Sequence, residues 1–395
     1  MTAAEGNSQG ASTRRAPGAA CSEAPKVRDH QGGPPYVFGR APVMLYWEIT
    51  RACDLACLHC RAEAMPHRHP QELDTEAAAA FLAQIRDFGE PFPHLVITGG
   101  DPLKRPDLDH LIAEARRLRL PVSLAPSATP LLTPRRLQHL RDAGLLGLSL
   151  SLDGATAARH DAVRGVSGTF THTLGLARAA AALGLPLQVN TLVSAETLQD
   201  LPPLLDLVGT LRVHRWSLFL LIAVGRGRVL RGITPAQAEA LCHWLAARAQ
   251  DAPFAIAATE APFYRRVVVQ RLRRAGITDR MIAVTPVGRS FGIRDGNGIA
   301  FVSHTGDVQP SGFLPVRAGN VRDDPVVRLY RHASVFVRLR DPDSFRGKCG
   351  YCSFRHLCGG SRARAFAHTG DYLASDPLCA YQPEPAPTPR DPTAA

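Results

Sequence analysis

The sequence predicts an α/β protein: a partial (β/α)6 barrel followed by a smaller, cysteine-rich α+β domain. Two observations carry this prediction. Between residues 43 and 250, six short apolar runs alternate with six stretches of helical periodicity. Beyond residue 250 the alternation stops, and four of the nine cysteines gather between residues 349 and 379. Strands that are each followed by a helix form a parallel sheet with helices outside it, here an open or partial barrel of the TIM type.

Each predicted strand is a short apolar run bounded by Gly, Pro or polar residues. The strands are expected at 43–49, 94–98, 121–125, 147–152, 187–193 and 215–224. The helices that follow them are expected at 75–88, 107–119, 134–143, 171–183, 200–209 and 235–250. Thr-Pro pairs at 133–134 and 234–235 mark two helix starts, because threonine is a favoured cap and proline is favoured in the first turn.

The ends and the later part of the chain differ from this core. Residues 1–40 are rich in Gly, Ala, Pro and Ser and are expected to be a disordered leader, and 382–395 a proline-rich disordered tail. The core barrel is expected over 41–255 and the second domain over 256–381, with the boundary near 255–295. This second part is expected to hold a strand at 254–258, a helix at 262–274, a hairpin over 298–310 and a helix at 325–339.

Composition limits the possible partners. The net charge is +11, and only three of the 46 basic residues are lysine. A GC-rich genome explains this arginine excess, and so does a site for anions such as carboxylates or nucleic acid. No dense basic run contains interleaved aromatic residues, so nucleic acid is disfavoured. The best apolar run, 216–224, is far too short to cross a bilayer.

The start of the sequence carries no apolar signal core, so a cytoplasmic, reducing setting is expected. Cysteines in such a setting are ligands or reactive thiols rather than disulfides. Cys242 is expected in the core, because it shares a helix face with apolar residues.

Cys53, Cys57 and Cys60 follow the first predicted strand with the spacing C-x3-C-x2-C. Three thiolates on one short loop can each bind one iron of a cubane cluster and leave the fourth iron open to a small molecule. Structural zinc is an alternative, although zinc sites usually close with four ligands in C-x2-C pairs. Buried free thiols are a third interpretation.

On this triad the sequence resembles the radical SAM superfamily, over about residues 42–230 and beyond. The resemblance implies a 4Fe-4S cluster whose open iron binds the amino and carboxylate groups of S-adenosylmethionine (SAM). It implies reductive cleavage of SAM to a 5′-deoxyadenosyl radical that abstracts a substrate hydrogen. It also implies an electron donor such as flavodoxin or ferredoxin. His59 stands where the family usually carries an aromatic residue near the adenine.

Further positions match the family. Gly99, Gly100 and Asp101, in Thr-Gly-Gly-Asp-Pro after the second strand, are similar to the Gly-Gly-Glu-Pro turn that binds the SAM amino group. Glycines allow close approach of the backbone to a ligand, and a carboxylate can accept hydrogen bonds from an ammonium group. Asp101 is one methylene shorter than the usual Glu.

The fourth strand ends in Ser-Leu-Ser151-Leu-Asp153-Gly, followed by His160 and then Arg164-Gly. This pattern is similar to that of radical SAM enzymes with cysteine-rich C-terminal extensions. It implies that Ser151 and Arg164 lie near the SAM carboxylate, and that Asp153 lies on the substrate side as a catalytic proton acceptor. An ordinary Asp-Gly turn is the alternative for Asp153. Asn190, on the fifth strand, is expected to hold the ribose.

A second cysteine group has the spacing C-x2-C-x5-C-x20-C, formed by Cys349, Cys352, Cys358 and Cys379. Four thiolates suffice for a closed metal site, and zinc is possible. The spacing resembles the SPASM extension of radical SAM proteins, which houses two auxiliary 4Fe-4S clusters. Arg362 and Ser311 stand where further cysteines would be expected, so one auxiliary cluster is expected here and the other is lost. A fully ligated cluster suits electron transfer or structure rather than substrate binding.

The resemblance implies a radical SAM enzyme, and two substrate classes follow from it. Members of this architecture act in haem-type tetrapyrrole or other cofactor biosynthesis, or modify ribosomally made peptides and proteins. Tetrapyrroles carry propionates, which an arginine-rich pocket would bind. The candidates for such a pocket are Arg226, Arg228, Arg231, Arg265, Arg266 and Arg294.

Tetrapyrrole chemistry is the favoured expectation, because residues 1–40 have too few apolar residues for a peptide-binding winged helix. An RNA-modifying protein and a non-catalytic iron–sulfur or zinc scaffold are further alternatives. Retention of the Gly-Gly-Asp-Pro turn and of Arg164 disfavours the scaffold.

Overall fold

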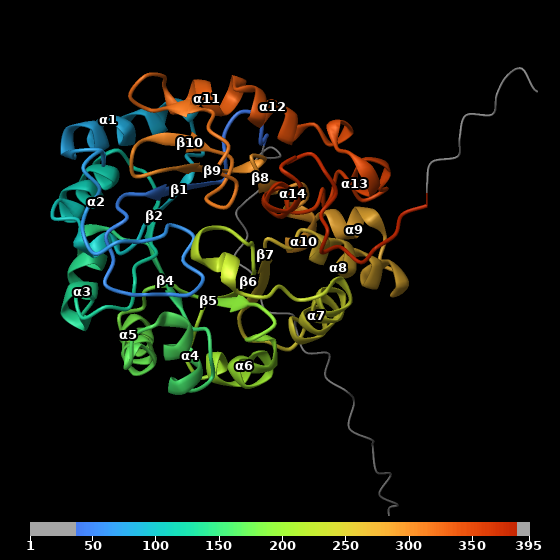
Figure 1. The fold of residues 1–395 in the computed structure, drawn as a ribbon, viewed down its shortest axis with the longest axis horizontal. Coiled ribbons are helices and arrows are strands. Elements are labelled where there is room, and N and C mark those ends of the chain that lie inside the picture. The colour runs from blue at the N-terminus through green and yellow to red at the C-terminus, as the bar shows by residue number, and fades with distance from the viewer. Residues whose placement is uncertain (1–36, 385–395) are drawn as a thin grey trace, which may run out of the picture. The chain divides into compact units, whose positions relative to one another are not determined.

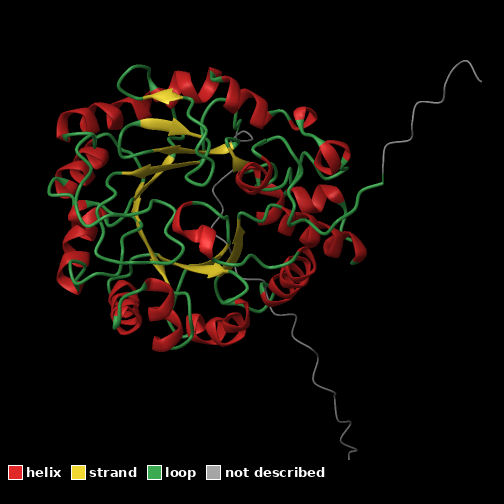
Figure 2. Cartoon of the chain, in the orientation of Figure 1, coloured by secondary structure: helices red, strands yellow, loops and turns green. Residues whose placement is uncertain are grey.

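The computed structural model describes residues 37–384, which form a sheet curved into a partial barrel with helices around its outside (Figures 1 and 2). Most of the predicted leader, with Cys21, and most of the predicted tail lie outside the described residues. The central strands are β1 Met44–Glu48, β2 His94–Thr98, β3 Val122–Leu124, β4 Gly147–Ser151, β5 Leu187–Val193, β6 Arg215–Leu220 and β7 Ala255–Thr259. They pair in chain order and run parallel, which confirms the predicted α/β barrel.

The helices outside the barrel connect these strands. They are α1 Thr75–Ile85, α2 Leu108–Arg117, α3 Pro134–Ala143, α4 Ala157–Arg164, α5 Thr169–Ala182, α6 Leu201–Gly209, α7 Pro235–Arg248 and α8 Phe263–Arg274. Both predicted Thr-Pro starts are present. Thr133 accepts a hydrogen bond from the N–H of Arg136, and Thr234 forms a capping box with Gln237. Cys242 is fully buried in α7, as expected.

The later part of the chain continues the same sheet. Its strands are β8 Arg294–Asp295, β9 Gly298–Val302, β10 Asp307–Gln309 and β11 Gly319–Asn320. Strand β9 pairs parallel to β1, with Leu45 opposite Ala300, and antiparallel to β10. The expected hairpin is therefore present, and it extends the barrel on the side of β1 opposite β2. Short helices complete this part: α9 Asp279–Ala283, α10 Pro286–Arg289, α11 Val326–His332, α12 Ser334–Arg340, α13 Gly347–Tyr351 and α14 Arg362–Thr369.

The C-terminal helix α14 joins the two ends of the curved sheet. Arg364 of α14 donates to the carbonyl oxygens of Leu220, which ends β6, and Glu260, which follows β7. At the start of the same helix, the N–H groups of Arg362 and Ala363 donate to Asp295 of β8. The helix thus joins the β6–β7 edge to the β8–β9 side, as Figure 1 shows from the position of α14.

Several elements differ from the sequence prediction. The sixth strand ends at Leu220 rather than at 224, and Leu221 and Ile222, which follow it, line a cavity. The helix expected at 325–339 is two helices, since Ala333 has extended backbone angles. Helices α4 and α14 were not predicted. Neither has an apolar stripe, because their buried faces hold His160 in α4 and two arginines and two alanines in α14.

The core consists of apolar side chains between the sheet and its helices. Trp47 of β1 is completely buried and packs edge-on against Phe81 of α1, with ring centroids 5.1 Å apart. Parallel strands covered on both faces read as nearly continuous apolar runs, which is why the strand positions could be predicted so closely. Among the helices of residues 37–384, none has the length and hydropathy needed to span a membrane.

Candidate active site

A cavity of about 240 Å³ lies at the carboxyl ends of the barrel strands. It gathers residues that are far apart in the sequence and that belong to the cysteine loop, to the turn after β2 and to the ends of β4, β5 and β6. Of the predicted site residues, those that line it are Cys53, Cys57, His59, Cys60, Gly99, Gly100, Ser151, Asp153, Arg164 and Asn190. Function at this end of the strands is the usual arrangement in α/β barrels.

The three sulfur atoms of the first cysteine group already accept polar contacts. The N–H of Leu55 donates to Cys53 Sγ at 3.4 Å, and the N–H of Ala64 donates to Cys60 Sγ at 3.4 Å. Arg164 donates to Cys57 Sγ at 3.6 Å. Such donors stabilise thiolate ligands and orient them toward an iron–sulfur cluster. The arrangement therefore fits the cluster that the spacing predicts.

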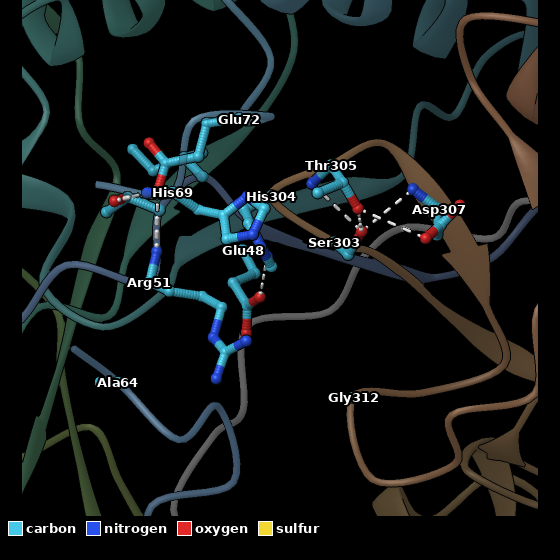
Figure 3. A network of polar contacts seen from close by, with 12 residues as sticks. Glu48, Arg51, Ala64, His69, Glu72, Ser303, His304, Thr305, Asp307 and Gly312 are labelled. Carbon is cyan, nitrogen blue, oxygen red and sulfur yellow. Dashed lines mark hydrogen bonds and ion pairs between the residues drawn. The ribbon is translucent and has the colours of Figure 1, made fainter. Parts of the chain in front are cut away.

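Two buried carboxylates hold the cysteine loop in place (Figure 3). Glu48, at the end of β1, accepts hydrogen bonds from Arg61 of the loop and from His304 of the β9–β10 hairpin, each at 2.7 Å. Burial raises the pKa of Glu48, but Arg61 and His304 lower it more, so the net pKa is below its usual value. The ionised Glu48 therefore links the cysteine loop to the C-terminal part of the sheet.

Glu72 is the second of these carboxylates. One of its oxygens accepts from the hydroxyl of Thr50 at 2.6 Å and from the N–H of Arg51 at 3.1 Å, while the other accepts from Arg68 at 2.7 Å. Figure 3 places Glu72 and Arg51 on the same side of this network, next to His69. Glu72 thereby fixes the backbone immediately before Cys53 through both a side chain, Thr50, and a backbone N–H, that of Arg51.

The turn after β2 contacts the backbone of the cysteine loop. The N–H of Gly100 donates to the carbonyl oxygen of Thr50 at 2.8 Å. A Cβ on Gly99 would lie 2.4 Å from the oxygen of Thr50, and a Cβ on Gly100 would lie 2.4 Å from that of Ala52. The two glycines are thus required for close backbone approach, in addition to lining the cavity.

Asp101 does not line the cavity. Its side chain is fully buried and accepts from the hydroxyl of Thr129 at 2.7 Å and from the N–H of Leu103 at 3.2 Å. Burial raises its pKa. The position of Asp101 therefore does not support the predicted contact with the SAM amino group, because its two carboxylate oxygens already accept hydrogen bonds from Leu103 and Thr129.

Asp153 and Arg164 form a buried ion pair next to Cys57. The other oxygen of Asp153 accepts from the N–H of Leu192 at 2.7 Å, and the N–H of Asp153 donates to His160 Nδ1 at 3.0 Å. Burial raises the pKa of Asp153, but Arg164 and the other polar groups around the carboxylate together lower it more, so the net pKa is below its usual value. A carboxylate held in this state is a weak base, which favours a positioning role over the predicted role as a proton acceptor.

Several donors and acceptors of the cavity wall are buried and unpaired. His59 Nδ1, Arg164 Nε, and Arg226 Nε and Nη2 have no hydrogen-bond partner among residues 37–384. Burial, followed by the nearby charge of Arg164, lowers the pKa of His59 to about 4, so its ring is neutral near pH 7. Each unpaired buried group costs about 1–3 kcal/mol. The wall therefore fits a polar ligand such as SAM, which carries a carboxylate, hydroxyls and ring nitrogens.

Ser151 and Asn190 lie on neighbouring strands and face the same cavity. They are paired in the register of β4 and β5. The Asn190 side chain accepts from Gln188 at 2.8 Å, which orients its amide. Arg61 and Phe313 also line the cavity, and Glu48 and His304 support it, although none of these four residues was predicted from the sequence. A single carboxylate at the end of an apolar strand was the available signal for Glu48.

The second cysteine group also comes together in space. All four predicted ligands line one small cavity with Arg266, Phe354 and Tyr381. The N–H of Phe354 donates to Cys352 Sγ at 3.4 Å, and the N–H of Gly360 donates to Cys358 Sγ at 3.3 Å. Burial raises the pKa of Cys358 to about 12, so binding of a cluster must displace its proton.

The structure shows the surroundings of the two residues that stand where further cysteines would be expected. Arg362 is fully buried beside Cys349, whereas Ser311 accepts from the N–H of Phe313 near the first cavity. Within residues 37–384, no three His, Cys, Asp or Glu side chains converge closely enough to bind a single metal ion. In a 4Fe-4S cluster each cysteine binds a different iron, so the ligands stand further apart.

Comparison with known proteins agrees with this geometry. The sequence pattern of the radical SAM superfamily matches residues 47–208. The AdoMet-dependent heme synthase of Methanosarcina barkeri is 37% identical over 343 residues, which cover 87% of this chain and 97% of the relative. The PqqA peptide cyclase of Rhodopseudomonas palustris is 29% identical over 364 residues, which cover 87% of this chain and 88% of the relative.

The fold is also similar to that of SuiB from Streptococcus suis, whose crystal structure was determined with the precursor peptide SuiA. The TM-score is 0.65 at 16% identity, and the match covers 87% of this chain and 76% of SuiB.

Proposed function

This chain belongs to the radical SAM superfamily and is an enzyme, and on that premise we propose that it acts on a carboxylate-bearing tetrapyrrole in haem-type or related cofactor biosynthesis. The family's 4Fe-4S cluster supplies reductive cleavage of SAM and, through it, hydrogen abstraction from a substrate carbon. The proposed ligands of this cluster are Cys53, Cys57 and Cys60, and those of the auxiliary cluster are Cys349, Cys352, Cys358 and Cys379. The proposed SAM-contacting residues are His59, Gly99, Gly100, Ser151, Arg164 and Asn190.

The residues of the cavity have distinct proposed roles. Asp153 holds Arg164 in place, and Arg164 presents donors both to Cys57 Sγ and to the cavity. Glu48 fixes the cysteine loop through Arg61. The apolar wall formed by Leu221, Ile222 and other side chains limits the access of water to the reacting atoms.

One observation carries the substrate proposal: Arg226 faces the cavity with two buried guanidinium nitrogens, Nε and Nη2, that have no hydrogen-bond partner among the described residues. A guanidinium is a planar fork of donors that matches a carboxylate, such as a tetrapyrrole propionate. Other arginines of the predicted set serve elsewhere. Arg231 pairs with Glu196, and Arg266 pairs with Glu239 and lines the second cavity.

The relatives support the same choice of substrate. The heme synthase is more similar to this chain than the peptide cyclase is, at 37% against 29% identity. Modification of a peptide or protein is the second candidate, supported by the peptide cyclase and by the fold of SuiB. We further propose a cytoplasmic enzyme with a flavodoxin- or ferredoxin-type donor. A net charge of +11 suits an acidic electron carrier, and the eight described cysteines are free thiols.

The test compares Arg226→Gln with the wild type and with Arg178→Gln, which changes an exposed arginine on α5. Each protein is reconstituted anaerobically and titrated with an iron tetrapyrrole that carries propionates, followed by its visible absorption. Loss of a charge-assisted pair should weaken tetrapyrrole binding about ten- to hundredfold in Arg226→Gln only.

A second readout is the formation of methionine and 5′-deoxyadenosine, which should depend on the tetrapyrrole. Turnover with a ribosomally made peptide but not with the tetrapyrrole would favour the second candidate. If the EPR signal of the wild-type cluster does not respond to SAM, the protein would instead be a non-catalytic iron–sulfur or zinc scaffold.

A further inference from the structure

Buried arginines surround the second cysteine group. Arg362 is fully buried, and Arg266 and Arg294 are each 3% exposed. Arg266 lines the cavity of the four cysteines, and Arg362 donates to Cys349 Sγ at 3.7 Å. A Cβ on Gly359, the residue after Cys358, would lie 3.0 Å from the Nε of Arg294. Three cationic side chains therefore pack against this one site.

Two of these cations have no carboxylate partner for their side chains among residues 37–384. Arg362 donates to the carbonyl oxygens of Ala374 at 2.7 Å and Tyr372 at 3.2 Å. Arg294 donates to the carbonyl oxygens of Gly292 at 2.9 Å and Leu339 at 3.0 Å. Its Nε has no hydrogen-bond partner in that part of the chain. Carbonyl groups orient these guanidinium groups but do not neutralise them.

The two unneutralised cations are also close to each other. The guanidinium carbons of Arg294 and Arg362 lie 5.0 Å and 4.6 Å from the centroid of the same ring, that of Phe345. Two like charges buried around one aromatic ring repel one another, and burial of an unpaired charge costs several kcal/mol. The buried carboxylate of Asp295 offsets part of the charge of Arg294, and a further negative group nearby would stabilise the arrangement. Four thiolates around an iron–sulfur cluster supply that negative charge.

We propose that Arg294 and Arg362, assisted by Arg266, form a cationic shell that raises the reduction potential of the auxiliary 4Fe-4S cluster. Reduction adds one negative charge to the cluster, and neighbouring positive charges in a low-dielectric interior stabilise the reduced state more than the oxidised state. Arg362 stands where the similar extensions carry a further cysteine. In this chain one substitution thus removes a ligand and adds a cation. The inference rests on the auxiliary cluster of the proposed function but not on its substrate.

The experiment is an EPR-monitored redox titration of the reconstituted full-length protein without substrate. Arg362→Met and Arg294→Met remove the charge, Arg362→Lys and Arg294→Lys retain it, and Arg178→Gln is a surface control. Each Met variant should lower the equilibrium constant for reduction of the auxiliary cluster at least tenfold, which is 59 mV for one electron. Each Lys variant and the control should stay near the wild-type potential.

Iron, sulfide and zinc analysis of each protein separates loss of the cluster from a change in its potential. A Met variant that keeps its cluster at the wild-type potential would overturn the proposal, and so would a Lys variant whose potential falls as far as that of its Met counterpart. Zinc in place of the auxiliary iron in the wild type would also overturn it. If both Met variants lose the cluster, wild-type potentials in both Lys variants support the proposal and lowered ones refute it. None of these results depends on turnover of a tetrapyrrole.

Discussion

Arg164 Nη1 lies 3.6 Å from the sulfur of Cys57, although 107 residues separate them in the sequence. The same guanidinium is held by the buried carboxylate of Asp153. The end of helix α4 is thereby joined both to the predicted cluster loop and to the end of the fourth strand. This contact carries a positive charge to the point where the cluster and SAM are expected to meet.

Replacement of Arg164 by methionine should weaken SAM binding at least tenfold, because a charge-assisted partner of the SAM carboxylate is lost. Iron content should stay near that of the wild type, since Arg164 is not a ligand. The measurement is the SAM concentration that half-saturates the change in the cluster EPR signal. Arg159→Met, on the same helix but paired with Asp200, should behave as the wild type. Unchanged SAM affinity in Arg164→Met would contradict the proposed role.

The two cysteine groups should each account for half of the bound iron. Wild-type protein should hold about eight irons, four for each cluster. The triple variant Cys53→Ala, Cys57→Ala, Cys60→Ala should keep about four and lose the EPR response to SAM. Alanine at all four C-terminal cysteines should also leave about four irons, with the response intact. Iron and acid-labile sulfide analysis measures this, and four irons with one zinc in the wild type would make the C-terminal site a zinc site.

Gly100→Ala should impair assembly of the first site. The added Cβ would lie 2.4 Å from the carbonyl oxygen of Ala52, the residue before Cys53, so the cysteine loop must shift. Lower iron content and a lower unfolding midpoint are expected. The matched control is Gly175→Ala within helix α5, where a Cβ meets nothing within 4 Å. That change should stabilise the protein by up to about 1 kcal/mol, because alanine favours helix more than glycine does. Equal effects of the two substitutions would refute this account.

Glu48→Gln should destabilise the protein by about 2 kcal/mol, because it leaves the partly buried cation of Arg61 without its carboxylate. The loop that carries Cys53, Cys57 and Cys60 should then bind iron less completely. Urea unfolding and iron analysis measure the two effects. Glu76→Gln, at an exposed position of α1, should change neither by a comparable amount. Stability of Glu48→Gln equal to that of the control would contradict the bridging role of Glu48.

His160 should make stability fall as the pH is lowered. Burial, followed by the charge of Arg164, lowers its pKa to about 4. The unfolded chain takes up a proton near pH 6.5 while the folded one does not until about pH 4, so falling pH favours unfolding across this interval and has no further effect below it. Between pH 7.5 and 6 the wild type should lose about 1 kcal/mol more than His160→Gln. Parallel urea-unfolding results for the two proteins would rule this out.

The parts of the fold that could be predicted depend on local periodicity. Strand β2 and helix α3 begin and end where the sequence indicates, since apolar runs and Thr-Pro starts are local signals. Helices α4 and α14 were missed because their buried faces are polar, and polar burial depends on partners elsewhere in the chain. The break at Ala333 was missed because no Gly or Pro occurs between residues 326 and 339 to indicate it.

The sequence by itself determined which cysteines belong together, because spacing on a short loop limits which thiolates can share one cluster, and its resemblance to the radical SAM superfamily implied the cofactors. Only the tertiary structure decided the surroundings of the clusters. It buries Asp101 against Thr129, pairs Asp153 with Arg164, leaves Arg226 facing the cavity and buries Arg362 against Cys349. Each of these relationships depends on where a side chain points across distant segments, and that direction is set by packing of the whole barrel.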